Sequence, residues 1–363
     1  MSMAMDTAIT RLFGIERPIL LAPMAGSAGS ELAIAVCEAG GLGSLPCAML
    51  TPEKIRTEMG VIRQRTNRPV NLNFFCHVPP VPDAAREAGW RQRLRPYYSE
   101  FGIDPDAAPP GAGRNPFSEE SCAIVEEFRP EVVSFHFGLP EPALVRRVKE
   151  TGAKVIASAT TVAEARFLEE RGCDAIIAQG AEAGGHRGVF LEEGIATQPG
   201  TLALVPQVVD AVSVPVIATG GVSDGRGVAA CFMLGASAVQ VGTAYLQSPE
   251  ALTSAGHRAA LATARDDRTV LTNVFTGRPA RGLLNRFVGE VGPMSDAAPE
   301  FPLATAAVGP LRAKAEAAGI SDFSPLWAGQ AAALAAPMPA GELTVKLMRD
   351  AETLLHGRGA SQG

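Results

Sequence analysis

Residues 1–248 alternate short apolar runs with helical patterns, and this alternation constrains the fold more than any other feature of the chain. Each run has the length of a buried strand, and the segments between the runs carry the periodicity and end signals of helices. Strands that are separated by helices pair in parallel through right-handed crossovers. Eight such units predict a closed (β/α)8 TIM barrel, with an open doubly wound sheet as the alternative.

The predicted elements follow one another without internal repeats beyond this rhythm. The strands are expected at Ile19–Pro23, Gly43–Leu45, Val70–Phe75, Val132–Phe137, Val155–Ser158, Ala175–Gln179, Val214–Thr219 and Ala238–Val241. The helices are expected at Ser30–Ala39, Pro52–Arg65, Ser118–Phe128, Glu141–Thr151, Val162–Arg171, Thr201–Ala211 and Gly225–Leu234, with Ser30 as a candidate N-cap. In either architecture, ligands bind at the carboxyl ends of the strands.

Two stretches do not follow the repeat. Residues 76–117 separate the third strand from the next helix and are rich in proline. We interpret them as a long loop inserted in the barrel, and loops of this length are often functional. Residues 249–340 contain polar and proline-rich segments, and we expect a cap or lid beside the mouth of a barrel formed by residues 1–248. Residues 341–363 are expected to form a terminal helix packed on the barrel.

Composition and spacing argue against several classes of partner. The chain has a net charge of −6 and no basic run, which argues against a nucleic-acid partner. No apolar run approaches the ~18 residues that a membrane span needs. Neither the six cysteines nor the five histidines stand at metal-ligand spacing, so we expect no metal. Most cysteines lie in apolar runs, which favours buried free thiols and a cytoplasmic location.

The sixth predicted strand leads into Gly180–Gly188, a loop with four glycines and one histidine, His186. Glycine lets the backbone approach a ligand closely and adopt positive φ. Histidine is the side chain best suited to moving a proton near neutral pH. A lone histidine is more often structural, but this one lies at the ligand-binding end of the fold. We therefore take His186 as the candidate catalytic base.

Glycine-rich turns also follow the seventh and eighth predicted strands. The first turn contains Gly220 and Gly221 and opens a helix, so it offers free N–H groups and the positive end of a helix dipole. The second turn consists of Gln240, Val241, Gly242 and Thr243. Because the corresponding loops of a barrel often form a phosphate site, the two turns together predict a phosphorylated ligand.

Other candidate site residues lie at the ends of the first, third and fourth strands. Pro23 ends the first strand, and Met24 offers a soft apolar surface for a flat ring, although a core methionine is the alternative. Asn71 and Asn73 face the same side of their strand and need partners, which a heteroaromatic ring or the backbone could supply. His136 lies between two phenylalanines and is either a pocket residue or a satisfied core histidine.

Taken together, these segments resemble the nitronate monooxygenases, formerly called 2-nitropropane dioxygenases. The Gly-Gly-His-Arg-Gly sequence around His186 is similar to the class I branch, whereas NADH:quinone reductases and flavin enoyl reductases tend to differ there. The segments that carry the resemblance are Ala22-Pro23-Met24, Asn71-Leu72-Asn73, Ser134–Gly138, Gly180–Gly188, Ala218–Gly221, Gln240–Thr243, Thr276–Arg281 and Leu326–Gln330.

The resemblance implies an FMN cofactor bound non-covalently in the barrel mouth. It implies oxidative denitrification, in which a nitronate or nitroalkane and O2 give a carbonyl compound and nitrite. His186 would remove the α-proton of a neutral nitroalkane, or orient and charge-pair a nitronate. Pro23 and Met24 would lie along the flavin ring, Asn71 and Gln179 would hydrogen-bond it, and Gly184, Gly221 and Gln240–Thr243 would hold the ribityl phosphate.

Two alternative functions share the barrel. One is an NAD(P)H-dependent FMN reductase acting on quinones or enoyl thioesters, and the other is a non-enzymatic barrel that binds a phosphorylated ligand. The class I pattern carries tyrosines and a lysine in the cap segment, whereas Phe301–Pro310 has none of these. This departure predicts a pocket with less to offer a small anion, and a substrate larger or more apolar than propionate 3-nitronate. The apolar residues 331–338 would need cover, which is compatible with a homodimer.

Overall fold

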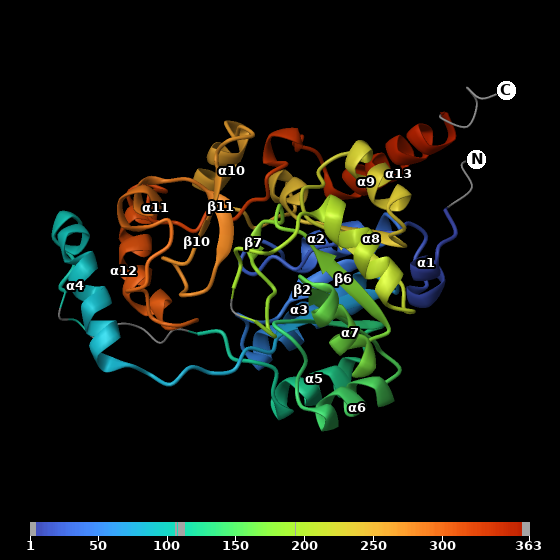
Figure 1. Ribbon diagram of the computed structural model, residues 1–363, viewed down its shortest axis with the longest axis horizontal. Helices are drawn as coiled ribbons and strands as arrows, with labels where there is room; N and C mark the ends of the chain where they lie inside the picture. The colour runs from blue at the N-terminus through green and yellow to red at the C-terminus, as the bar shows by residue number, and fades with distance from the viewer. Residues whose placement is uncertain (1–4, 106, 108–112, 193, 358–363) are drawn as a thin grey trace.

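The structure, a computed structural model, describes residues 5–105, 107, 113–192 and 194–357. Its centre is a parallel eight-stranded sheet with the order β1-β9-β8-β6-β5-β4-β3-β2 (Figure 1). Leu42, just before β2, bridges Leu20 of β1 and brings the two edge strands together, so the predicted (β/α)8 barrel is confirmed. The strands are β1 (Ile19–Leu21), β2 (Gly43–Pro46), β3 (Val70–Phe75), β4 (Val132–His136), β5 (Lys154–Ala159), β6 (Ala175–Gln179), β8 (Val216–Thr219) and β9 (Ala238–Val241).

Helices connect successive barrel strands, as the alternation predicts. They are α2 (Ser30–Glu38), α3 (Pro52–Arg65), α5 (Glu119–Phe128), α6 (Pro142–Glu150), α7 (Val162–Glu170), α8 (Thr201–Ala211) and α9 (Gly225–Met233). Thr51, Ser118 and Thr161 cap α3, α5 and α7 by accepting a backbone N–H in the first turn. Ser30 does not act as the predicted N-cap; it is the first helical residue, and its N–H donates to the Glu58 carboxylate.

The amino-terminal end of the barrel is closed by apolar side chains. α1 (Ala8–Phe13) places Ile9 and Phe13 in one hydrophobic cluster with residues from the beginnings of the strands. These strand residues include Leu20, Val132, Ile156, Ala175, Ile217 and Ala238. Because this end is filled, a ligand has room only at the carboxyl ends of the strands, as in other barrels.

The insertion after β3 contains a helix, so the prediction of a long loop is wrong for this part. α4 (Ala84–Glu100) begins after Asp83, whose carboxylate accepts the N–H groups of the first turn. Trp90, Leu94 and Tyr98 recur every fourth residue and form one buried stripe. The stripe packs on α12 (Ala304–Ala317), beside which α4 lies in Figure 1. Pro96 stands inside the helix, so the proline content of this segment does not exclude a helix.

The C-terminal region adds a small antiparallel sheet to the mouth of the barrel. Its order is β10 (Thr269–Thr272), β11 (Ala280–Leu283) and β7 (Gly185–His186). His186 therefore belongs to a short strand rather than to an unpaired loop. Shorter elements complete the region: η1 (Thr243–Gln247), α10 (Ala255–Ala262), α11 (Arg286–Val291) and η2 (Ala332–Leu334). The terminal helix α13 (Ala340–Gly357) packs back against α9 and α2.

Within the described residues, no helix combines the length and apolarity that crossing a membrane requires. The same part of the chain holds no group of three or more His, Cys, Asp or Glu side chains suited to a metal ion. All six cysteines are free thiols, and five of them are buried.

Candidate active site

A cavity of about 310 Å³ lies at the carboxyl ends of the barrel strands. Its volume is within the usual range of small-molecule sites. Side chains alternate along a strand, so the last inward position of each strand faces this cavity. Six of the eight strands place a polar side chain on this cavity near their carboxyl ends: Asn73, His136, Ser158, Gln179, Thr219 and Gln240.

The cavity brings together all of the predicted site residues except Asn71 and Val241. Val241 faces the surrounding helices because its neighbour Gln240 faces inward. Asn71 lies one inward position deeper, where its amide nitrogen donates to Ser44 Oγ and Ser134 Oγ at 3.0 and 2.8 Å. The lining includes Pro23, Met24, His136, Gln179, Gly184, His186, Gly220, Gly221, Gln240, Gly242 and Thr243, together with Asn73 in place of Asn71.

The loops after β8 and β9 offer free hydrogen-bond donors to a ligand. Gly220 and Gly221 have φ values of +119° and +68°, a region that favours glycine. Among the described residues, the backbone N–H groups of these glycines and of Gly242 have no protein acceptor. Ser223 Oγ is also buried without a partner. Because Asp224 caps the first turn of α9, the donors available to a phosphate are those of the loops. This arrangement fits a phosphate group.

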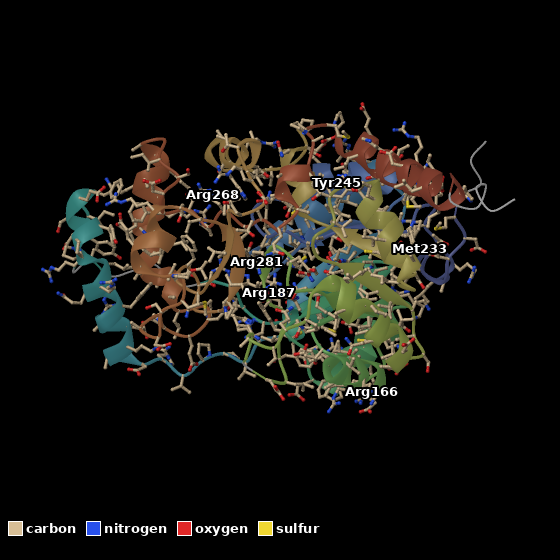
Figure 2. All side chains as sticks on the ribbon, turned by 45° about the horizontal axis from the view of Figure 1, so that its top comes forward. Arg166, Arg187, Met233, Tyr245, Arg268 and Arg281 are labelled. Carbon is tan, nitrogen blue, oxygen red and sulfur yellow. The ribbon has the colours of Figure 1, made fainter. Side chains whose placement is uncertain are left out.

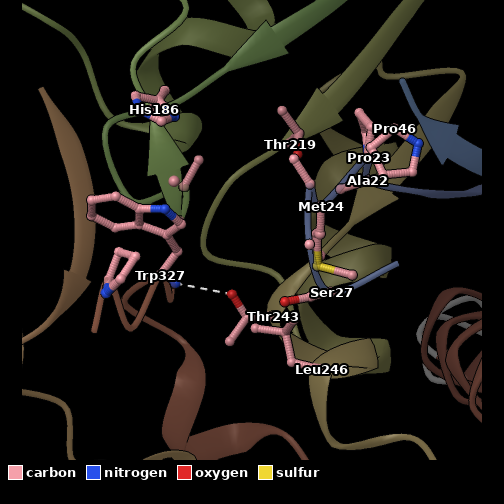
Figure 3. Close-up of a pocket in the computed structure, with 18 of the residues that line it drawn as sticks. Ala22, Pro23, Met24, Ser27, Pro46, His186, Thr219, Thr243, Leu246 and Trp327 are labelled. Carbon is pink, nitrogen blue, oxygen red and sulfur yellow. Dashed lines mark hydrogen bonds between the residues drawn. The ribbon is translucent and has the colours of Figure 1, made fainter. Parts of the chain in front are cut away.

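A flat ring fits beside these loops. Met24 and Trp327 lie on opposite sides of the cavity in Figure 3 and offer a thioether and an indole surface. The Trp327 segment is held to the barrel by Gly329, whose N–H donates to Thr243 Oγ1 at 2.9 Å. A Cβ atom at Gly184 would lie 2.6 Å from the Gly329 nitrogen, so only glycine permits this approach.

His186 is oriented by a hydroxyl group from the C-terminal region. Its Nε2 lies 2.9 Å from Thr276 Oγ1, and this oxygen lies 3.4 Å from the carbonyl of Arg278. A hydroxyl has one proton, so if Thr276 donates to that carbonyl it accepts from the imidazole. We assign the ring proton to Nε2 on this basis, which leaves Nδ1 with a lone pair.

The backbone of His186 is fixed by side chains that line the barrel mouth. Gln179 Nε2 and His136 Nε2 donate to the His186 carbonyl at 3.1 and 3.3 Å. The amide oxygen of Gln179 accepts the N–H of Gly188 at 2.7 Å. Gln179 therefore holds the histidine segment as well as facing the cavity.

Arg187 holds the same segment from inside. Its buried guanidinium donates to a series of backbone carbonyls, those of Gly180, Ala181, Ala183, Gly184 and Gly185. In Figure 2 it lies beside Arg281, where the barrel meets the C-terminal region. Burial lowers the pKa of Arg187 to about 9, so it remains a cation at neutral pH. Its role in the structure is to shape the segment that carries His186.

His186 and His136, two of the three histidines that line the cavity, are neutral at physiological pH. Burial, followed by the charges of Arg114 and other neighbours, holds the pKa of His186 well below its usual value of 6.5. Burial and Arg278 lower the pKa of His136 to about 3. His186 can therefore accept a proton or a hydrogen bond, but it supplies no positive charge.

Aromatic rings surround His186. The centroids of Phe301, Trp327, Phe137 and Phe75 lie 5.3, 5.5, 6.0 and 6.4 Å from that of its imidazole. These rings exclude water and offer an apolar surface to a substrate chain. Phe301 belongs to the cap segment in which the sequence showed no tyrosine or lysine.

Thr276, which contacts His186, and Trp327 and Arg114, which line the cavity, were not predicted as site residues. Thr276 and Trp327 lie in two of the segments that resemble the family, so the resemblance could have marked them as candidate site residues. Arg114 lies in the proline-rich insertion, where no motif marks it. It lines the cavity, and its Nη1 donates to Thr305 Oγ1 at 2.9 Å. The sequence predicted that the pocket has few groups to bind a small anion. This prediction is wrong in part, because the insertion places the cation Arg114 in the cavity.

The arrangement defines a class of protein: a (β/α)8 barrel with a small-molecule cavity at the carboxyl ends of its strands. A family model described as nitronate monooxygenase matches residues 6–350. Nitronate monooxygenase of Pseudomonas aeruginosa is 44% identical over 95% of this chain and 99% of its own. The chain therefore belongs to the nitronate monooxygenase family, as the motifs indicated. The family consists of flavin-dependent oxidoreductases, and the cavity fits a flavin.

Further relatives and solved structures agree with this assignment. Nitronate monooxygenase of Paraburkholderia phytofirmans is 41% identical and covers 94% of each chain. The crystal structure of nitroalkane oxidase from Streptomyces ansochromogenes superposes with a TM-score of 0.87 at 38% identity, over 96% of this chain and 100% of that one. FabK from Thermotoga maritima superposes with a TM-score of 0.76 at 30% identity, over 98% and 99%.

Proposed function

We propose that the protein is an FMN-dependent nitronate monooxygenase that converts an alkyl nitronate and O2 to a carbonyl compound and nitrite. One observation carries the proposal beyond family membership. The neutral, oriented imidazole of His186 shares a cavity with the free donors of the loops at Gly220 and Gly242. A proton acceptor and a phosphate site are thus joined by a slot that fits a flat ring.

FMN would supply the redox chemistry when it is bound, and the chain would supply position and electrostatics. The free N–H groups of the glycine loops would hold its phosphate, and Met24 and Trp327 would lie against its ring. The residues that we propose for cofactor binding are Pro23, Met24, Asn73, Gln179, Gly184, Gly220, Gly221, Gln240, Gly242 and Thr243.

The state of His186 bears on which form of substrate is used. A base removes a carbon-bound proton efficiently when its pKa lies near the working pH. Burial holds the pKa of His186 well below 6.5, which makes it a weak base for a neutral nitroalkane. A nitronate has already lost this proton. The site therefore favours the nitronate, which His186 would orient through a hydrogen bond.

Oxygen uptake and nitrite formation test this function. FMN-loaded protein should consume O2 and release nitrite from ethyl and propyl nitronates without NADH, and should act more slowly on the parent nitroalkanes. A protein that binds no flavin, or that forms no nitrite from any of these nitronates, would overturn the proposal.

A flavin reductase is the second candidate function, because the structure also superposes on FabK from Thermotoga maritima. Anaerobic mixing with NADH or NADPH separates the two functions. Rapid bleaching of the bound flavin, followed by turnover of a quinone or an enoyl thioester, would favour the reductase. Slow or absent bleaching together with nitrite formation would favour the monooxygenase.

The cellular setting is part of the proposal. Free, mostly buried thiols suit a reducing compartment, so we propose a cytoplasmic enzyme. A homodimer stays a prediction from the apolar residues 331–338, and light scattering of the purified protein tests it.

A further inference from the structure

The cavity holds a charged side chain that the scheme above does not use. We propose that Arg114 binds the two oxygens of the nitronate group and thereby selects the anionic nitronate over the neutral nitroalkane. The identity of the anion rests on the proposed function. The presence of an anion subsite rests on the residues around Arg114.

The position of Arg114 places it at the substrate end of the cavity. Its guanidinium carbon lies 5.9 Å from the centre of the Phe301 ring, and the imidazole of His186 lies 5.3 Å from the same ring. Thr305, the second residue of α12 and four residues beyond Phe301, accepts a hydrogen bond from Arg114 Nη1. The cation and the histidine thus share one aromatic neighbour.

The charge of Arg114 is not compensated by a carboxylate in the described part of the chain. Burial and the neighbouring cation Arg312 lower its pKa to about 10, so it is charged at neutral pH. A guanidinium has five N–H donors, and the one protein acceptor found for it among the described residues is Thr305. A largely buried cation without a counterion favours the binding of an anion.

The other cations near the cavity have protein partners. Arg187 is surrounded by backbone carbonyls. Arg278 donates to the Val189 carbonyl and lies 4.1 Å above the Phe137 ring. Arg312 pairs with Glu316 at 2.8 Å. Since His186 is neutral, Arg114 is the group best placed to receive the charge of a substrate.

The backbone conformation of Arg114 also supports a role in ligand binding. Its φ of +64° lies in the left-handed region, which residues other than glycine rarely adopt. Residues held in such conformations concentrate at ligand and active sites. Here the conformation accompanies a side chain that reaches the cavity.

The chemistry of the two partners matches. A nitronate carries its negative charge largely on two oxygens in one plane, as a carboxylate does. A guanidinium offers parallel N–H donors to such a group. A neutral nitroalkane lacks the net charge and gains less from the same contact. The aromatic rings around His186 remain available for the alkyl chain.

Arg114→Met and Arg114→Lys test the inference, with Arg95→Met as the matched control from the exposed face of α4. Loss of a hydrogen bond to a charged group corresponds to a rise in KM for propyl-2-nitronate of about 10- to 100-fold in the Met variant. KM for neutral 2-nitropropane should change far less. The Lys variant should fall between, because it keeps the charge without the paired donors. The control should match the wild type.

A second readout does not depend on turnover. Isobutyrate resembles the nitronate in shape and charge but does not react, and Trp327 lies in the same cavity. Quenching of tryptophan fluorescence should give an isobutyrate dissociation constant that rises by a similar factor in Arg114→Met and stays unchanged in Arg95→Met.

The outcomes are distinguishable. Unchanged KM and isobutyrate affinity in the Met variant would overturn the inference while leaving the proposed function intact. If the wild type forms no nitrite but binds isobutyrate through Arg114, the anion subsite stands and the proposed function fails. If the Met variant does not fold, unchanged KM and affinity in the Lys variant would overturn the role of Arg114.

Discussion

The two ends of the cavity are built in different ways. At the end that we propose for the phosphate, called the phosphate end below, two short barrel loops present backbone N–H groups, among them those of Gly220 and Gly242. At the substrate end, side chains converge from separate segments: Arg114 from the insertion, His186 from β7, and Phe301 and Trp327 from the C-terminal region. Backbone donors serve any ligand with the same phosphate, whereas side chains can change from one chain to another. The proposed cofactor end therefore depends mainly on backbone geometry, whereas the proposed substrate end depends on the identity of individual side chains.

His186→Asn should lower turnover without weakening FMN binding, and it should give the largest change in rate among these variants. Loss of a general base typically lowers a rate by about 10²- to 10⁴-fold, so kcat for a neutral nitroalkane should fall within this range. The effect on nitronates should be smaller, because no carbon-bound proton is removed. Nitrite release measures the rate, and flavin absorbance should show that FMN is retained.

The control for this substitution is His356→Asn, on the exposed end of α13. It should match the wild type in both assays. Equal turnover of nitroalkanes by the His186 variant and the wild type would show that His186 is not the base.

Gly220→Ala should break the phosphate end. A Cβ atom there would lie 2.8 Å from Thr201 Oγ1, which is fixed by hydrogen bonds to Glu182 and to the Gly220 carbonyl. The positive φ adds a strain of about 1–3 kcal/mol for a residue other than glycine. We expect FMN binding to weaken by about tenfold or more, since 1.4 kcal/mol is a factor of ten in affinity. Titration of the apoprotein with FMN measures this.

Gly60→Ala is the matched control, because a Cβ atom at Gly60 in α3 would meet nothing within 4 Å. A glycine-to-alanine change inside a helix is stabilising by roughly 0.5–1 kcal/mol. If Gly220→Ala bound FMN as tightly as Gly60→Ala, the free donors of this loop would not form the phosphate site.

The same division explains what could be predicted from the sequence. The glycines of the phosphate end follow directly from local requirements, and the strand alternation places Gln240 inward. The alternation did not tell Asn71 from Asn73, because both face the barrel interior and only depth separates them.

The substrate end depends on contacts between distant segments. The Tyr98 hydroxyl donates to the Ala307 carbonyl, 209 residues away in sequence, and such contacts anchor the insertion on α12. The position of Arg114 follows from this packing and from no local motif. Thr276 and Trp327 could be suspected from motifs, but their contacts with His186 required the fold.

Lowering the pH should reduce the stability of the part of the structure that contains neutral, buried histidines. These histidines lie at the substrate end and in the neighbouring C-terminal region, and the phosphate loops contain no histidine. Burial, followed by Arg312 and Arg258, lowers the pKa of His257 to about 4. The unfolded chain, with a histidine pKa near 6.5, then binds more protons than the folded one below that pH. The stability contributed by neutral His257 is therefore present above pH 6.5 and is lost as the pH falls toward 4.

Between pH 7.5 and pH 5, this loss is about 2 kcal/mol for one buried histidine. Urea unfolding at the two pH values should show a smaller drop for His257→Gln than for the wild type. His356→Gln, at an exposed position, should retain the full drop. Parallel pH dependence in all three proteins would contradict a neutral buried His257.

Thr276→Val should give the smallest effect and tests how much of the substrate end depends on one hydroxyl. Valine has nearly the shape of threonine but cannot accept the hydrogen bond from His186 Nε2. A single hydrogen bond contributes about 1 kcal/mol, so kcat for a neutral nitroalkane should fall about fivefold with FMN binding unchanged. Thr276→Ser should restore the rate. If the valine variant keeps the wild-type rate, the pairing of β7 with β11 is enough to orient His186, and backbone geometry governs both ends of the cavity.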